Sequence, residues 1–109
     1  HWDESLTASR AVLESVLGQI AGLHSRSAGV ALDTDALSRP ERVRGYLEES
    51  GLLDHNEEKA IASVYALLDE TGAHPHIEPR DWARLMRHLA LTLSQFAILR
   101  FKDLTASSS

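Results

Sequence analysis

The last third of the sequence constrains the fold most, because it predicts a helix that is apolar on nearly every side. Pro79 suits the first turn of that helix, and Asp81 suits the positive end of the helix dipole. One predicted face carries the larger apolar side chains, namely Trp82, Leu85, Met86, Leu89, Leu93 and Phe96, whereas Leu91 and Ile98 lie nearly opposite. A helix of this kind is either central in a bundle or shared with a partner chain.

Two segments upstream of it also have helical spacing. Asp3 to Ser25 carries two adjacent apolar stripes, which indicates burial against more than one neighbour. Residues 26–35 predict a loop. The spacing of Ser38 and Glu41 then predicts a capping box, and a short helix with Pro40 in its first turn follows to about residue 50.

Glycines mark the expected ends of two helices. Gly51 is a left-handed stop after the short helix, and Asp54 with Glu57 predicts the capped start of the next one. An apolar stripe continues from there to about Thr71, where Gly72 is the expected stop.

These patterns together predict an all-α protein. The sequence has no alternation of period two and no internal repeat. We therefore expect a small four-helix bundle, with one helical domain over residues 1–104 and a disordered polar tail over residues 105–109. The apolar last helix suggests a dimer formed through that helix.

The composition limits the classes of function. The net charge of −5 over 109 residues disfavours non-specific nucleic-acid binding by the domain as a whole, without excluding a local basic patch. Cysteine is absent, and no apolar run is long enough to span a membrane, so we expect a cytoplasmic protein that does not enter membranes. Because residue 1 is His, we expect a piece of a longer protein.

His74 and His76 are the weak candidates for metal ligands, because two histidines one residue apart can hold a metal when a third ligand approaches. His88, Asp69 or Glu70 could supply that ligand. Exposed loop histidines are common, however, and metal sites need three or four convergent ligands. We therefore expect neither a metal nor another cofactor.

A basic stripe on the last predicted helix is the candidate nucleic-acid or phosphate site. Arg80, Arg84, Arg87 and His88 lie along one side of the helix at spacings of three and four. The alternative is a solvated face on which acids pair with arginines, for example Asp81 with Arg84. The chain is acidic and no aromatic residue is interleaved on the basic side of this helix, since Trp82 belongs to the apolar face, which favours this alternative. Glu14, within an apolar helix, fits a boundary position better than a catalytic one.

Three stretches, read in order, resemble a known family. They are ASRAVLESVLGQI (residues 8–20), LLDETGAHP (residues 67–75) and LALTLSQFAILRF (residues 89–101). They resemble the opening helix, the central Arg-Asn-x-x-Gly-x-x-His-Gly segment and the closing helix of abortive-infection C-terminal domains. That family is similar to the HEPN superfamily of small, often dimeric helical bundles, many of which are metal-independent RNases in prokaryotic defence or toxin–antitoxin systems.

The sequence departs from the family at the residue that matters most for cleavage. If His74 is the family's His, the Arg position falls near Leu67, followed by Leu68 and Asp69. The resemblance therefore implies a non-catalytic interaction or dimerisation module, the C-terminal accessory domain of a prokaryotic defence or phage-related protein. The alternative is a HEPN-type RNase or RNA- or nucleotide-binding domain.

The two hypotheses use different residues. Self-association, or docking to other domains of the parent protein, would use the interface candidates Leu91, Phe96, Ile98 and Phe101. RNA binding would use His74 with Arg84, Arg87 and His88, and His74 and Arg87 would be the catalytic residues.

Overall fold

The computed structural model describes residues 2–69 and 77–107, and the chain is helical through most of them. The helices are α1 (Trp2–Ala28), α2 (Thr34–Leu37), α3 (Pro40–Glu49), α4 (His55–Asp69) and α5 (Pro79–Ser107). No strand occurs in these residues. The all-α prediction is confirmed, and α2 is a short helix inside and just beyond the segment predicted as a loop.

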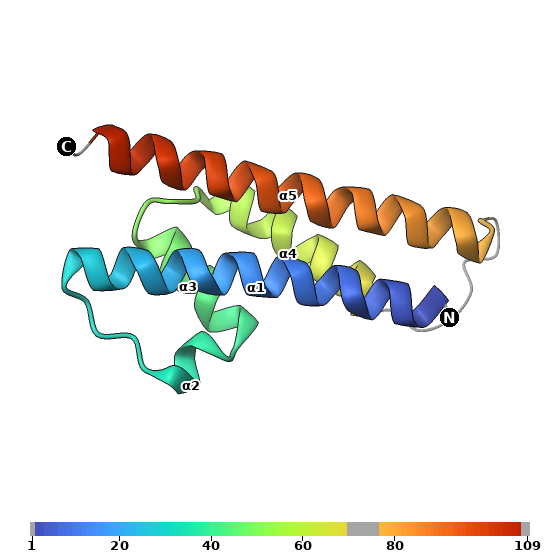
Figure 1. Ribbon diagram of the computed structural model, residues 1–109, viewed down its shortest axis with the longest axis horizontal. Coiled ribbons are helices and arrows are strands. Elements are labelled where there is room, and N and C mark those ends of the chain that lie inside the picture. The colour runs from blue at the N-terminus through green and yellow to red at the C-terminus, as the bar shows by residue number, and fades with distance from the viewer. Residues whose placement is uncertain (1, 70–76, 108–109) are drawn as a thin grey trace.

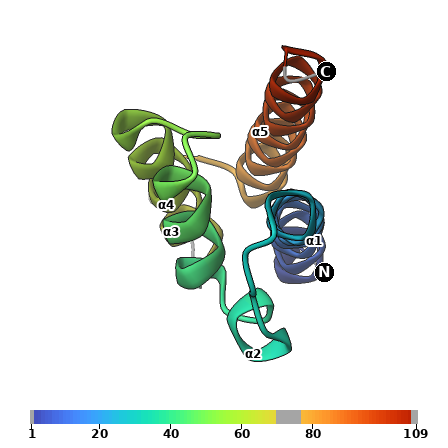
Figure 2. The same cartoon turned by 90° about the vertical axis from the view of Figure 1, so that its left-hand side faces the viewer.

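Two long helices set the shape of the molecule, which measures 48 × 27 × 21 Å. Helices α1 and α5 lie side by side and run in the same direction (Figure 1). Helices α3 and α4 pack on one side of this pair, and the opposite side of the pair faces away from them (Figure 2). The contact between α1 and α5 is the most extensive in the described chain.

Local signals fixed several helix boundaries as predicted. Asp54 and Glu57 cap α4 reciprocally: the Glu57 N–H donates to Asp54 Oδ1 at 2.7 Å, and the Asp54 N–H donates to Glu57 Oε1 at 2.8 Å. Gly51 has a φ of +84°, a conformation that favours glycine. Pro79 is the first residue of α5. The predicted stop at Gly72 lies outside the described residues.

The predicted Ser38–Glu41 capping box is wrong, because Ser38 closes α2 instead of opening α3. Its hydroxyl donates to the Asp35 carbonyl at 2.7 Å. Arg39 occupies the N-cap of α3 and makes no side-chain capping bond, while Pro40 takes the first helical position as expected. Ser38 lies between the end of α2 and the start of α3, so its hydroxyl could bond at either helix end. It bonds the Asp35 carbonyl in the last turn of α2.

The last helix is longer than the sequence indicates. It continues to Ser107, so a disordered tail that begins at residue 105 is wrong for residues 105–107. The Thr105 hydroxyl donates to the carbonyls of Phe101 and Lys102, both at 3.0 Å, which ties this residue to the preceding turn.

The core contains a line of small residues that the apolar pattern did not single out. Ala83, Ala90 and Ala97 are buried on α5 at intervals of seven residues. On α1, Leu13 and Leu17 are fully buried in the same cluster. Small side chains at heptad spacing allow two helices to approach closely along their length. We call Ala83, Ala90 and Ala97 the alanine seam.

The alanine seam explains why one predicted core residue is exposed. Leu85 was expected on the buried face, but 46% of its surface is accessible. It lies two residues after Ala83, about 200° further round the helix, so burial of the seam turns it outward. Trp82 and Met86 are buried, as predicted.

Candidate functional site

Helix α5 presents an uncharged apolar face to solvent on the side away from the alanine seam. Leu85 and Leu99 are 46% and 54% exposed. Thr92 is also exposed and lies seven residues from each leucine, so all three share one side of the helix. We call these three residues the Leu85–Leu99 face. His88 is exposed at its edge.

A second apolar surface lies on the flank of α5 that borders α1. Leu91 and Ile98 are 49% and 38% exposed there. Leu91 lines a hollow of about 170 Å³ together with Ala8 and Val12 of α1 and with Arg87 of α5. We call this space the α1–α5 hollow. Its accessible surface is almost entirely apolar.

The four predicted interface candidates divide into two pairs. Leu91 and Ile98 are exposed, as the prediction requires. Phe96 and Phe101 are partly buried and pack against the core, so both stabilise the fold of the single chain. Leu99 was not singled out, although its spacing from Leu85 was visible in the sequence. The recurrence of alanine every seven residues was the signal that would have predicted both leucines on the solvent-exposed side of α5.

The basic stripe is exposed along the first half of α5. Arg80, Arg84, Arg87 and His88 all reach solvent. Asp81 lies 4.0 Å from Arg80 Nε, so the expected pairing of Asp81 with Arg84 is replaced by a weaker contact with its neighbour. Within residues 2–69 and 77–107, neither Arg84 nor Arg87 forms an ion pair. These two guanidinium groups are therefore open to an external anion.

The proposed metal ligands cannot be assembled from the described residues. His74, His76 and Glu70 lie outside them, and the side chain of Asp69 is likewise not described. Among the described residues, no three His, Asp or Glu side chains gather in a way that could hold a metal ion. The distance from His74 to any arginine also lies outside the described part of the chain.

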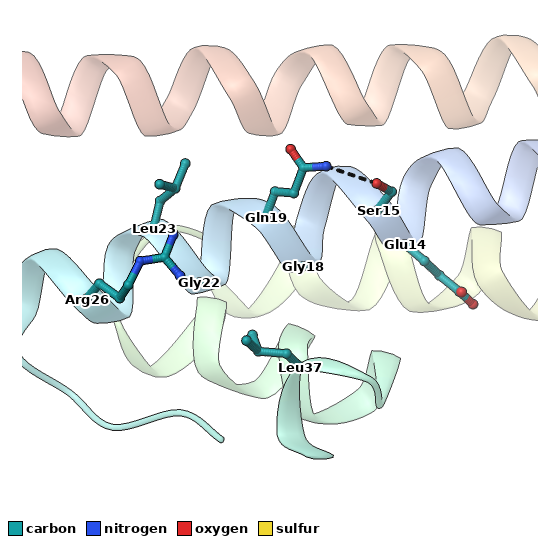
Figure 3. A pocket seen from close by; sticks show the side chains of 8 residues that line it. All are labelled: Glu14, Ser15, Gly18, Gln19, Gly22, Leu23, Arg26 and Leu37. Carbon is teal, nitrogen blue, oxygen red and sulfur yellow. Dashed lines mark hydrogen bonds between the residues drawn. The ribbon is translucent and has the colours of Figure 1, made fainter. Parts of the chain in front are cut away.

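Glu14 lines a groove of mixed polar and apolar surface that the sequence did not predict. The groove has a volume of about 480 Å³ and lies between α1 and Leu37 of α2 (Figure 3). Gly18 and Gly22 form its floor, and a Cβ added at either position would meet Leu37 at 3.8–3.9 Å. Glu14 also borders the two neighbouring clefts toward α3 and α4.

The one carboxylate that lines this groove already has a partner outside it. The Glu14 carboxylate lies 3.4 Å from Arg10 Nε, one helical turn earlier on the same helix. In Figure 3, Gln19 donates to the Ser15 hydroxyl at 3.1 Å along the same wall. Glu14, Ser15 and Gln19 are thus engaged in contacts along α1, and we assign the groove no reaction.

Two polar contacts join the helices beneath these surfaces. His24 Nδ1 and the Tyr46 hydroxyl lie 2.6 Å apart between α1 and α3, and burial raises the pKa of the Tyr46 phenol. Arg44 Nε lies 3.3 Å from Glu58 Oε1, and its guanidinium lies 4.8 Å from the centre of the Tyr65 ring. Both contacts fix α3 in place.

Comparison with known proteins adds no relative. No protein-family model matches the sequence, and no curated protein and no solved structure matches it. Among the described helices, none combines the length and the apolar character needed to cross a membrane.

Proposed function

We propose that this chain is a non-catalytic helical interaction module that self-associates through the Leu85–Leu99 face of α5. The observation that carries the proposal is the exposure of two leucines on an uncharged side of the longest helix. Apolar surface of this kind gains free energy when it is removed from water. A second copy of the chain would remove the two leucines from water without the need for any other partner.

The spacing of the face suits two-fold symmetry. Thr92 lies midway between the leucines, so a two-fold axis at Thr92 sets Leu85 against the partner's Leu99 and Leu99 against the partner's Leu85. Each copy contributes only two exposed leucines to this contact. We therefore expect weak association, in the high-micromolar range.

A non-catalytic role is supported because this chain has a leucine near the position at which HEPN RNases carry an arginine. That position falls near Leu67, which is partly buried and packs against the core. The resemblance to abortive-infection C-terminal domains supports a HEPN-like bundle and a cytoplasmic setting in prokaryotic defence. It also supports the role of a C-terminal accessory domain in a defence or phage-related protein.

Sedimentation equilibrium of the purified chain tests self-association. We expect a monomer–dimer equilibrium in the wild type and a shift to monomer in Leu85→Gln and Leu99→Gln. Leu23→Gln is the matched control, because Leu23 is equally exposed but lies on α1. A wild-type chain that stays monomeric at high micromolar concentration contradicts the proposal, as does equal dimerisation of all four proteins.

RNA binding is the second candidate function, and it is favoured by the two open guanidinium groups of Arg84 and Arg87. It predicts salt-sensitive binding of single-stranded RNA that is lost in Arg87→Ala, with cleavage lost in His74→Ala. Absence of binding at low salt removes this candidate.

A further inference from the structure

The α1–α5 hollow has the size and lining of a receptor for one apolar side chain. Its volume of about 170 Å³ is close to that of apolar protein cavities of about 150 Å³ that accept a benzene-sized group. Ala8 and Val12 contribute one wall and Leu91 the other. All the residues that line the hollow belong to α1 and α5, and none of them comes from α3 or α4.

Two arginine side chains lie at or near the edge of this hollow. Arg87 lines it, and Arg84 lies one helical turn earlier on the same flank of α5. Neither arginine forms an ion pair within the described residues. The net charge of the whole chain is −5, so this flank is a local exception. An apolar receptor next to open guanidinium groups is complementary to an apolar side chain flanked by carboxylates.

We propose that the α1–α5 hollow binds an acidic amphipathic helix of another protein. One leucine- or phenylalanine-sized side chain of that helix enters the hollow, and carboxylates one and two turns away bind Arg87 and Arg84. This is the helix-in-groove mode of recognition, in which anchors recur every three or four residues. The site uses a different flank of α5 from the proposed dimer and does not depend on it.

The charges of the flank argue against a second copy as the occupant. A two-fold pairing that sets Leu91 against the partner's Ile98 also sets Arg87 against the partner's Lys102. Like charges would then meet beside the apolar contact.

An acidic helix also fits better than RNA. Sequence-tolerant binding of single strands combines basic grooves with aromatic side chains on which bases stack. The hollow is lined instead by aliphatic and small side chains, including Ala90 and Ser9.

Fluorescence anisotropy with a defined probe tests the inference. The probe is a labelled synthetic helix with a leucine ridge flanked by glutamates, and the control probe carries glutamine at each glutamate. A uridine oligonucleotide is the third probe. Each is titrated with the wild type and with Leu99→Gln, which alters the dimer face alone. We expect the glutamate peptide to bind both proteins, more weakly as salt is raised.

Two substitutions test the two parts of the site. Arg87→Gln removes one charge and is expected to weaken binding about fivefold. Ala8→Leu fills the hollow from an exposed position and is expected to weaken binding about tenfold. The matched controls are Arg42→Gln on α3 and Ala60→Leu on α4, which are also exposed and lie away from the hollow. Both controls should bind as the wild type does.

Several outcomes overturn the inference. They are equal binding of the glutamate and glutamine peptides, no effect of Ala8→Leu, or tighter binding of the oligonucleotide than of the peptide. Failure of the peptide to bind while the wild type dimerises removes this inference alone. Peptide binding by a chain that stays monomeric removes the proposed dimer alone.

Discussion

Replacing an alanine of the alanine seam by leucine should lower the free energy of unfolding, by an amount that depends on the space around it. Ala97 is buried against the core, so the three carbons added in Ala97→Leu must displace packed neighbours. Overpacking of this kind costs about 1–3 kcal/mol. Ala90→Leu should cost less, although Ala90 is only 1% exposed, because Ala90 borders the α1–α5 hollow and its longer side chain has space to enter.

Thermal unfolding followed by circular dichroism measures the difference. For a domain of this size, each kcal/mol lowers the melting temperature by roughly 4–8 °C. Ala97→Leu is therefore expected to melt about 10 °C below the wild type, with Ala90→Leu between them. Ala60→Leu, at an exposed position of α4, should lie within about 0.5 kcal/mol of the wild type.

The predicted order of melting temperatures is Ala60→Leu highest, then Ala90→Leu, then Ala97→Leu. If Ala97→Leu melts at the same temperature as the wild type, the core is not tightly packed around Ala97. If Ala90→Leu is the more damaging substitution, the hollow does not provide the space that the structure shows.

Three further predictions concern polar contacts. Because burial raises the pKa of Tyr46 above its usual value of 10.0, the folded chain holds this proton longer than the unfolded chain, and the free energy of unfolding should fall as pH rises above about 10. Tyr46→Phe should flatten that fall in urea titrations and, at neutral pH, cost about 1 kcal/mol through the lost bond to His24. Glu58→Gln leaves Arg44 with a neutral partner and should cost about 1 kcal/mol in the same assay, less at high salt. Asp54→Ala removes an N-cap and should cost about 1 kcal/mol, and hydrogen exchange in the first turn of α4 should accelerate.

Helix boundaries were predictable where the signal is local. Pro79, Gly51 and the reciprocal Asp54–Glu57 cap depend on a few neighbouring residues, and the structure places all of them as expected. Ser38 shows the limit of such reasoning, because two helix ends lie within reach of the same hydroxyl.

The buried side of α5 was harder to predict, because the helix is apolar over a wide arc. Large side chains suggested a face that includes Leu85, whereas the structure buries the small residues of the alanine seam. The groove at Glu14 was missed for a related reason. It forms only because α2 folds back over Gly18 and Gly22, and no local pattern encodes that approach.

Disulfide trapping at the proposed two-fold axis is a direct test of self-association through the Leu85–Leu99 face. The natural chain has no cysteine, so Thr92→Cys introduces a single thiol at the centre of the Leu85–Leu99 face. Two copies of that residue would face each other across the axis at a separation a disulfide can span. Ser63→Cys, exposed on α4, is the control. We predict that Thr92→Cys forms a covalent dimer at least about tenfold faster than the control under mild oxidation. Equal rates of cross-linking for the two variants would contradict self-association through this face.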